Sequence, residues 1–293
     1  MQLDLFMHSA DVGLRNTVVE ALRAQDAVGM GAAIDRLRAD YPRDDHLDGF
    51  ERLFVGLSAL NPPAQSPTGI AEQLERIEMQ LLPSVQKLLG TDAAQRWVEP
   101  IYLDLARAAA GTPFSRSQSS THAAGLLLRA GAVAEARAAV AEIASWRRIP
   151  EPLFWMTEIA LRENKPAEFW PLLAELAWIA PALLEALLAG LGAHATPAQV
   201  HRLYREFGSA AEVDDDGDEA SWFPAWLLVE HPELLSFLRT VQHHSSRPAR
   251  SATVLIDLLI GERQGALPSS PEKCKQLRDL APSLFQNYMA RRR

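Results

Sequence analysis

The side chains that most often do acid–base, nucleophilic or metal chemistry are scattered along the chain. Eight histidines occur, but none forms an H-E-x-x-H pattern, and no Walker loop, G-x-S-x-G turn or dinucleotide-binding glycine pattern is present. His243 and His244 are consecutive, so on a helix they point in different directions and make poor joint metal ligands. Cys274 lies between Lys273 and Lys275, whose charges favour the thiolate, yet no recognisable motif supplies a histidine partner. We therefore expect a protein that is not an enzyme, with no catalytic residue, metal site or cofactor; an enzyme with an unfamiliar site is the alternative.

An acidic run from Glu212 to Glu219 contains part of a calcium-loop pattern. Asp214, Asp216 and Gly217 have the right spacing. If Gly217 is position 6 of a twelve-residue EF-hand loop, however, position 12 is Phe223, where the loop needs a bidentate glutamate. The run is therefore interpreted as a solvated loop.

The first residues form the most specific functional motif in the chain. Gln2, Leu3, Asp4, Leu5 and Phe6 read QLDLF. This pentapeptide resembles the one by which bacterial DNA polymerases, mismatch-repair proteins and replication regulators dock onto the β sliding clamp, and all five positions match. The resemblance implies a partner, the clamp, and a place in DNA replication or repair.

The resemblance also implies a role for each residue. Leu5 and Phe6 would enter an apolar pocket on the clamp, Leu3 would add contact area, and Gln2 would hydrogen-bond at the rim. Burial of two such side chains contributes roughly 1.5–3 kcal/mol each, less the cost of ordering the segment, which corresponds to micromolar binding. The alternative is structural: Leu3, Leu5 and Phe6 belong to an extended arm that packs on the first helix pair.

Tryptophans are concentrated in the second half of the chain. At helical spacing they are typical of a core, although a concave binding surface lined by aromatic anchors is the other interpretation. The residues concerned are Trp146, Trp155, Trp170, Trp178, Trp222 and Trp226.

The C-terminal region, residues 247–293, reverses the charge balance of the chain. It holds nine lysines and arginines against four acidic residues. Such a region suits contact with DNA phosphates. No interleaved aromatic pattern of a single-strand binder accompanies it, so direct DNA contact stays open.

The elements that must position these residues are helices, and the stretch from Thr121 to Leu191 shows their arrangement best. Apolar residues at steps of three and four run into a break at Gly131 and again at Asn164, 33 positions later. Pro150 and Pro181 close the two units 31 positions apart. That is the period of a two-helix repeat, whose apolar stripes are buried when helix pairs stack into a superhelix.

At these residues the chain resembles the tetratricopeptide repeat family in a degenerate form. Such a repeat has, in order, a small, a large, a turn, a small and a large residue at the positions occupied here by Ala124, Leu127, Gly131, Ala136 and Val140. An echo occurs from Ala21 to Pro42. The resemblance implies an all-α fold, an α-α superhelix or TPR-like helical-repeat solenoid, that binds a further, unidentified protein. A scaffold for an unrelated peptide, with the N-terminal arm merely packed, is the alternative function.

Helical periodicity also predicts the N-terminal helices. The first helix is expected to be capped by Asp11 and another by Thr91 or Asp92, and Ser66-Pro67-Thr68 is expected to open a long helix. Together with the Ser-rich connector at 111–121, these patterns predict four parts. They are an arm (1–10), an N-terminal helical block (11–111), central repeats (112–208) and a C-terminal block (209–293).

Composition excludes several classes of protein. The chain has 293 residues, 48% hydrophobic and 23% charged, and a net charge of −8, which disfavours a general nucleic-acid coat. A single cysteine permits no internal disulfide and favours a cytoplasmic location. No signal peptide or membrane span is expected, because the most apolar stretch contains Glu175, Pro181 and Glu185. Abundant Ala, Leu, Arg and Pro suggest a bacterial source.

Overall fold

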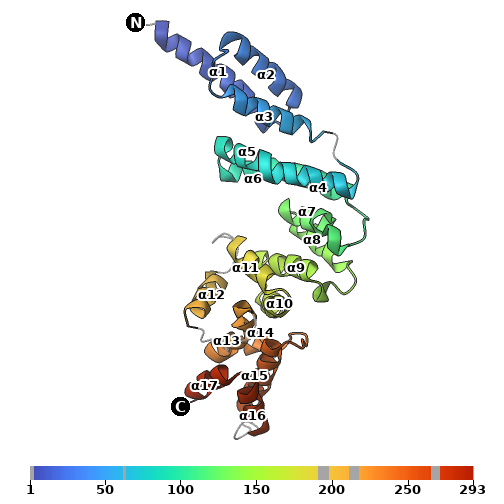
Figure 1. Ribbon diagram of the computed structural model, residues 1–293, viewed down its shortest axis with the longest axis vertical. Coiled ribbons are helices and arrows are strands. Elements are labelled where there is room, and N and C mark those ends of the chain that lie inside the picture. Colours follow the sequence, from blue (N-terminus) through green and yellow to red (C-terminus); the bar gives the residue numbers. More distant parts are fainter. Residues whose placement is uncertain (1–2, 62–63, 191–197, 211–217, 265–270, 293) are drawn as a thin grey trace. The chain divides into compact units, whose positions relative to one another are not determined.

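The computed structural model describes residues 3–61, 64–190, 198–210, 218–264 and 271–292, and every regular element within these ranges is helical (Figure 1). The predicted all-α class is therefore confirmed. The chain forms two compact units, Met1–Ala136 and Arg137–Arg293. Within the described ranges, no helix has the length and apolar character that crossing a membrane requires.

The first unit is built from sequential helices in which α1 packs on α2, α2 on α3, α5 on α6 and α6 on α7. Its elements are α1 (Leu3–Arg23), α2 (Ala27–Asp40), α3 (Leu47–Ser58), α4 (Pro67–Arg76), the π-helix η1 (Ile77–Leu81), α5 (Leu82–Leu89), α6 (Thr91–Ala108), the 3₁₀-helix η2 (Arg116–Thr121) and α7 (Ala123–Arg129). The short helix α8 (Val133–Ala141) follows α7. The Ser-rich segment expected as a connector contains η2, which packs on α4 and α7.

Helix α1 begins at Leu3, eight residues before the predicted start. No proline or glycine interrupts the chain between Leu3 and Asp11, so nothing there stops a helix. Asp11 is therefore not an N-cap; instead it pairs one turn on with Arg15, at 2.8 Å. The predicted cap of α6 is also wrong by one or two residues, because Gly90, with φ of 83°, precedes that helix.

One turn geometry recurs at three helix junctions. Gln25, Gly131 and Asn164 all have positive φ, of 55°, 75° and 52°. In each case the next residue's N–H donates to a carbonyl five residues earlier: Asp26 to Ala21, Ala132 to Leu127 and Lys165 to Ala160, at 2.9–3.1 Å. This is the Schellman arrangement that ends a helix and starts the next. The predicted breaks at Gly131 and Asn164 are confirmed as helix junctions, and the predicted echo near Ala21 shares the motif.

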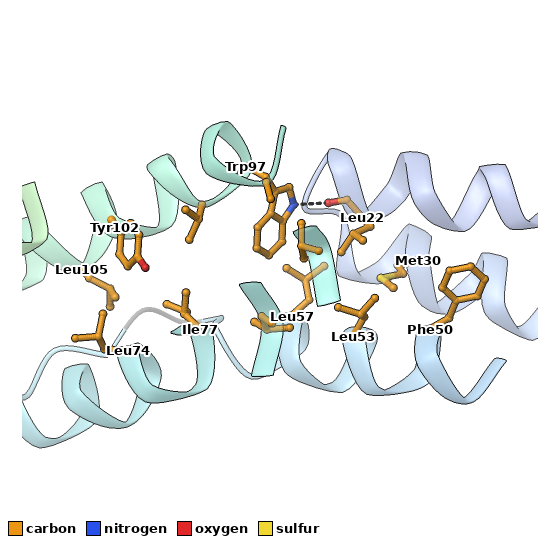
Figure 2. Close-up of a cluster of buried hydrophobic side chains, with 14 of the residues drawn as sticks. Leu22, Met30, Phe50, Leu53, Leu57, Leu74, Ile77, Trp97, Tyr102 and Leu105 are labelled. Carbon is orange, nitrogen blue, oxygen red and sulfur yellow. Dashed lines mark hydrogen bonds between the residues drawn. The ribbon is translucent and has the colours of Figure 1, made fainter. Parts of the chain in front are cut away.

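The core of the first unit is a continuous apolar cluster (Figure 2). It joins α1, α2, α3, α6 and the continuous helix formed by α4, η1 and α5, called the α4–α5 helix below. The residues that form the cluster, all nearly or fully buried, include Leu22, Met30, Phe50, Leu53, Leu57, Leu74, Ile77, Trp97, Tyr102 and Leu105. Gly31 allows close packing, since a Cβ there would lie 3.0 Å from Phe54. The helices that periodicity predicts in this part of the chain are therefore confirmed.

The predicted long helix after Ser66 is confirmed, with a π turn that periodicity did not indicate. The Ser66 hydroxyl accepts from the Gly69 N–H at 3.1 Å, as an N-cap does. Within η1, the Leu82 N–H donates to the Ile77 carbonyl, five residues back. Pro83 follows immediately, and its ring would clash with the carbonyl of residue 79 in a regular helix. The π turn comes directly before this proline, and the helix continues through it to Leu89.

The second unit is centred on α10 and α13, most of whose side chains are buried. Its elements are η3 (Trp146–Arg148), α9 (Pro150–Arg162), α10 (Pro166–Ile179), α11 (Pro181–Gly190), α12 (Ala198–Ala210), η4 (Glu219–Trp222), α13 (Phe223–Glu230), η5 (Pro232–Leu234), α14 (Leu235–Leu238), α15 (Arg247–Arg263), α16 (Pro271–Leu280) and α17 (Pro282–Ala290). Rings of Tyr204, Phe207, Phe223 and Trp226 pack α12 against α13, with centroids 5.1–6.2 Å apart.

Candidate functional site

The predicted clamp-binding residues lie at the beginning of α1. The backbone of Leu3, Asp4, Leu5 and Phe6 forms its first turn. Gln2 and the side chains of these four residues lie outside the described part of the chain. Their proposed contacts with a partner therefore stay a prediction.

The backbone geometry places the start of α1 beyond its partner helix. Helix α1 has 21 residues and α2 has 14. In an antiparallel pair the seven extra residues of α1 amount to about 10 Å of helix without α2 alongside. Between residues 10 and 17 no side chain is fully buried, and Val18 is the first buried one among the side chains that the structure describes. Figure 1 shows this end of α1 extending past α2 and α3.

An ion pair holds α1 just behind this extension. The Arg15 guanidinium contacts Asp44, in the loop between α2 and α3, at 2.7 Å, and Asp11 at 2.8 Å. The Asp44 side chain is 1% exposed and also accepts from the His46 N–H at 2.8 Å. Burial opposes ionisation of this carboxyl, but the hydrogen bonds from His46 and Arg15 outweigh it and hold the pKa of Asp44 below its usual value.

A second surface feature, which the sequence did not indicate, lies between α3 and the α4–α5 helix. This α3–α4 groove has a volume of about 750 Å³. Leu53, Gly56 and Leu81 are its buried apolar residues, Val55 is 65% exposed, and Arg52 and Arg76 also line it. At Gly56 the two helices touch, because a Cβ there would lie 2.5 Å from the Leu81 side chain.

The two arginines of the groove come from different helices. Arg52 is exposed on α3 and forms no ion pair with a described residue. Arg76, at the end of α4, donates to the Ala59 carbonyl at 3.3 Å and likewise has no carboxylate partner among the described residues. Periodicity could not find this arrangement, since it depends on how α3 packs against η1.

The tryptophans belong mainly to the core, as predicted. Trp155, Trp170, Trp178, Trp222 and Trp226 are 1–8% exposed, whereas Trp146 is half-buried. They do not form an exposed row of aromatic anchors.

The basic C-terminal region uses several of its charges internally. The Arg247 Nε donates to the Leu280 carbonyl at 2.6 Å, Lys273 pairs with Asp257 at 2.9 Å, and Arg291 pairs with Glu230. Arg292 pairs with Glu262 and lies over the Tyr288 ring, with 4.9 Å from its guanidinium carbon to the centroid. These contacts attach α17 to α13 and α15 and leave fewer cations for a nucleic acid.

The residues considered for catalysis or metal binding do not come together in the described part of the chain. No group of three His, Cys, Asp or Glu side chains there could hold a metal ion. His244 contacts the Ser246 hydroxyl at 3.0 Å, and Cys274 is half-buried without a disulfide. Most of the acidic run lies outside the described residues, which resume at Asp218.

Comparison of the chain with protein-family models, with curated proteins and with solved structures finds no match.

Proposed function

We propose that this chain is a non-catalytic helical-repeat protein-interaction module that docks onto the bacterial β sliding clamp through residues 2–6. The single observation that carries the proposal is the five-residue match of Gln2-Leu3-Asp4-Leu5-Phe6 to the clamp-binding pentapeptide. The extension of α1 past α2 supports it, because a segment without a helix alongside can be offered to a partner at low cost.

Docking would change the local backbone. Consecutive positions on an α-helix lie about 100° apart. Binding of Leu5 and Phe6 in one pocket therefore requires the first turn of α1 to unwind. End turns of a helix are its least stable part, so this unwinding is a small cost against the apolar burial gained.

The proposed scaffold is a TPR-like α-α superhelix in which successive helix pairs stack. The recurrence of one junction geometry at Gln25, Gly131 and Asn164 supports it. Small-angle scattering tests this arrangement. A superhelix gives a radius of gyration well above the ~19 Å expected for a globular chain of this length, whereas a value near that figure contradicts the stacked arrangement.

Titration of purified β clamp with the full-length chain tests the docking proposal. The wild type should bind with micromolar affinity, and Leu5→Ala/Phe6→Ala should abolish binding at an unchanged melting temperature. The control Val12→Ala/Met79→Ala removes two other large apolar side chains, 46% and 73% exposed, and should bind as the wild type does. A small loss of helical circular dichroism should accompany binding.

The opposite result identifies the alternative function. If the wild type does not bind the clamp and Leu5→Ala/Phe6→Ala melts several degrees lower, residues 3–6 contribute to packing. Clamp docking is then wrong, and a scaffold for an unrelated partner is the function that fits.

A further inference from the structure

A second pocket of the first unit lies between the start of α2, the turn after α3 and α6. This α2–α6 pocket has a volume of about 320 Å³, at the small end of the range for ligand sites. Leu57 and Leu105, which Figure 2 shows in the core of the first unit, and the half-buried Ile101 give it apolar walls. Val28, which also lines it, is 85% exposed. An occupant would therefore remove apolar surface from water.

The charged residues that line this pocket are acidic. Asp26 precedes α2 and Asp104 lies on α6, and no lysine, arginine or histidine among the described residues lines the pocket. Asp104 pairs with Arg107 one turn on, whereas Asp26 forms no ion pair with a described residue. Even when Arg107 is counted, two carboxylates stand against one guanidinium. The pocket therefore has an excess of negative charge, and its complement is a cation.

The polar groups of the lining offer hydrogen-bond acceptors. One carboxylate oxygen of Asp26 accepts from the Gly29 N–H at 2.8 Å, and the other has no partner among the described residues. The side-chain amide of Gln25 donates to the Trp97 carbonyl, which leaves the Gln25 side-chain oxygen as an acceptor. The exposed side chain of Asn61 forms no hydrogen bond with a described residue. A ligand that matches this lining brings several N–H donors.

We propose that the α2–α6 pocket binds an arginine side chain of a partner protein, next to an apolar residue that covers Val28. The guanidinium would lie between Asp26 and Asp104. It presents five N–H donors in one plane, whereas an ammonium presents three and is more strongly hydrated. The methylene stem of an arginine packs well on apolar walls such as Leu57 and Ile101. This inference rests on the proposed protein-interaction function and names the chemistry of the further partner.

Titration of the full-length chain with short peptides tests the proposal. The probe is N-acetyl leucine-arginine-leucine amide, and two matched probes carry citrulline or lysine in place of the arginine. Citrulline has the shape of arginine without its charge. In heteronuclear NMR spectra, the arginine peptide should shift the side-chain amide signals of Gln25 and Asn61 saturably. It should bind about five-fold more tightly than the citrulline peptide, as one solvent-accessible ion pair allows, with the lysine peptide between the two.

Charge-neutral variants locate the site. Asp26→Asn keeps the cap of α2, because asparagine caps a helix as well as aspartate does. Asp26→Asn and Asp104→Asn should each reduce the preference for arginine over citrulline, and the double variant should remove it. The matched control is Asp35→Asn, because Asp35 and Arg38 have the same i,i+3 arrangement as Asp104 and Arg107 but do not line the pocket. It should bind all three peptides as the wild type does.

A further pair of variants tests the apolar contact. Val28→Ser should weaken all three peptides, because the leucine beside the central residue loses its contact. Val12→Ser, at a valine that is 46% exposed on α1, should leave all three affinities unchanged. Melting temperatures of all variants check that they remain folded.

Three outcomes would overturn the proposal. They are the absence of saturable shifts at Gln25 and Asn61, equal affinity for the arginine and citrulline peptides, and equal effects of Asp104→Asn and Asp35→Asn. Tightest binding of the lysine peptide would contradict a guanidinium site. A dimer that light scattering detects in the wild type but not in the double variant would identify an arginine of a second copy as the occupant and refute a separate partner. Because residues 2–6 are intact in every variant, a parallel clamp titration reports separately whether clamp docking holds.

Discussion

The indole N–H of Trp97 donates to the backbone carbonyl of Leu22 at 2.6 Å (Figure 2). In return, the side-chain amide of Gln25 donates to the Trp97 carbonyl at 2.5 Å. These two bonds join residues 75 and 72 positions apart in the sequence and tie α6 to the α1–α2 junction. The Leu22 carbonyl also accepts from the Gln25 N–H at 3.0 Å, so the indole is its second donor.

Replacing Trp97 by Phe should destabilise the first unit. The substitution removes one of the two donors to the Leu22 carbonyl, which costs about 0.5–1.5 kcal/mol, in addition to the smaller ring's lost contacts. Urea unfolding measures the change in the free energy of unfolding. The control is Trp178→Phe, since Trp178 is 6% exposed and its indole N–H has no hydrogen-bond partner among the residues that the structure describes. A loss at Trp178 as large as at Trp97 would contradict the role of the hydrogen bond.

Two glycine-to-alanine substitutions should have opposite signs. A Cβ added at Gly131 or at Gly49 would have no neighbour within 4 Å, so packing does not distinguish the two positions. Gly131→Ala should cost about 1 kcal/mol because its φ is 75°. Gly49→Ala, inside α3, should stabilise by about 0.5–1 kcal/mol. Thermal unfolding of both variants checks the prediction, and a stabilising Gly131→Ala would contradict the left-handed junction.

The sequence predicted helices well where an apolar stripe and a breaking residue agree. Gly131 and Asn164 mark junctions because glycine and asparagine tolerate positive φ, and Ser66 is a good cap because its hydroxyl reaches the Gly69 N–H. The prediction that Asp11 caps the first helix failed, because an aspartate inside a helix also pairs favourably with an arginine one turn later. The π turn could not be predicted from Pro83, because prolines also lie inside α6 and α10, which have no π turn.

The two candidate sites also differ in whether the sequence alone can reveal them. Residues 2–6 are contiguous, so their motif can be recognised without a structure. Arg52 and Arg76 are 24 positions apart on different helices, and only the crossing of α3 with η1 at Gly56 places both on one groove. A site built by packing in this way leaves no periodic signal in the sequence.

A buried carboxylate should be important to the second unit. Glu175 on α10, 2% exposed, accepts two hydrogen bonds of 2.6 Å from Arg147 and one of 2.6 Å from the Gln242 N–H. Glu175→Gln should cost about 2 kcal/mol, because the new amide places a donor against the guanidinium. Chemical denaturation measures the loss. Glu206→Gln, which breaks the exposed pair with Arg202, should change stability by less than about 0.5 kcal/mol. Equal effects would contradict this account.

Asp44 should make the first unit sensitive to acid. Its folded-state pKa lies below the usual value of 3.8, so at a given acidic pH this carboxyl binds fewer protons in the folded chain than in the unfolded chain. The stability that it contributes is present above the unfolded pKa of about 3.9 and is lost as the pH falls through the lower folded pKa. The difference in unfolding free energy between wild type and Asp44→Asn should therefore be largest at neutral pH and shrink below about pH 4. Denaturant titrations at several pH values measure this difference in unfolding free energy. The control is Asp45→Asn, which removes an exposed neighbouring carboxylate. A difference that grows in acid would show that the ion pair with Arg15 does not stabilise α1.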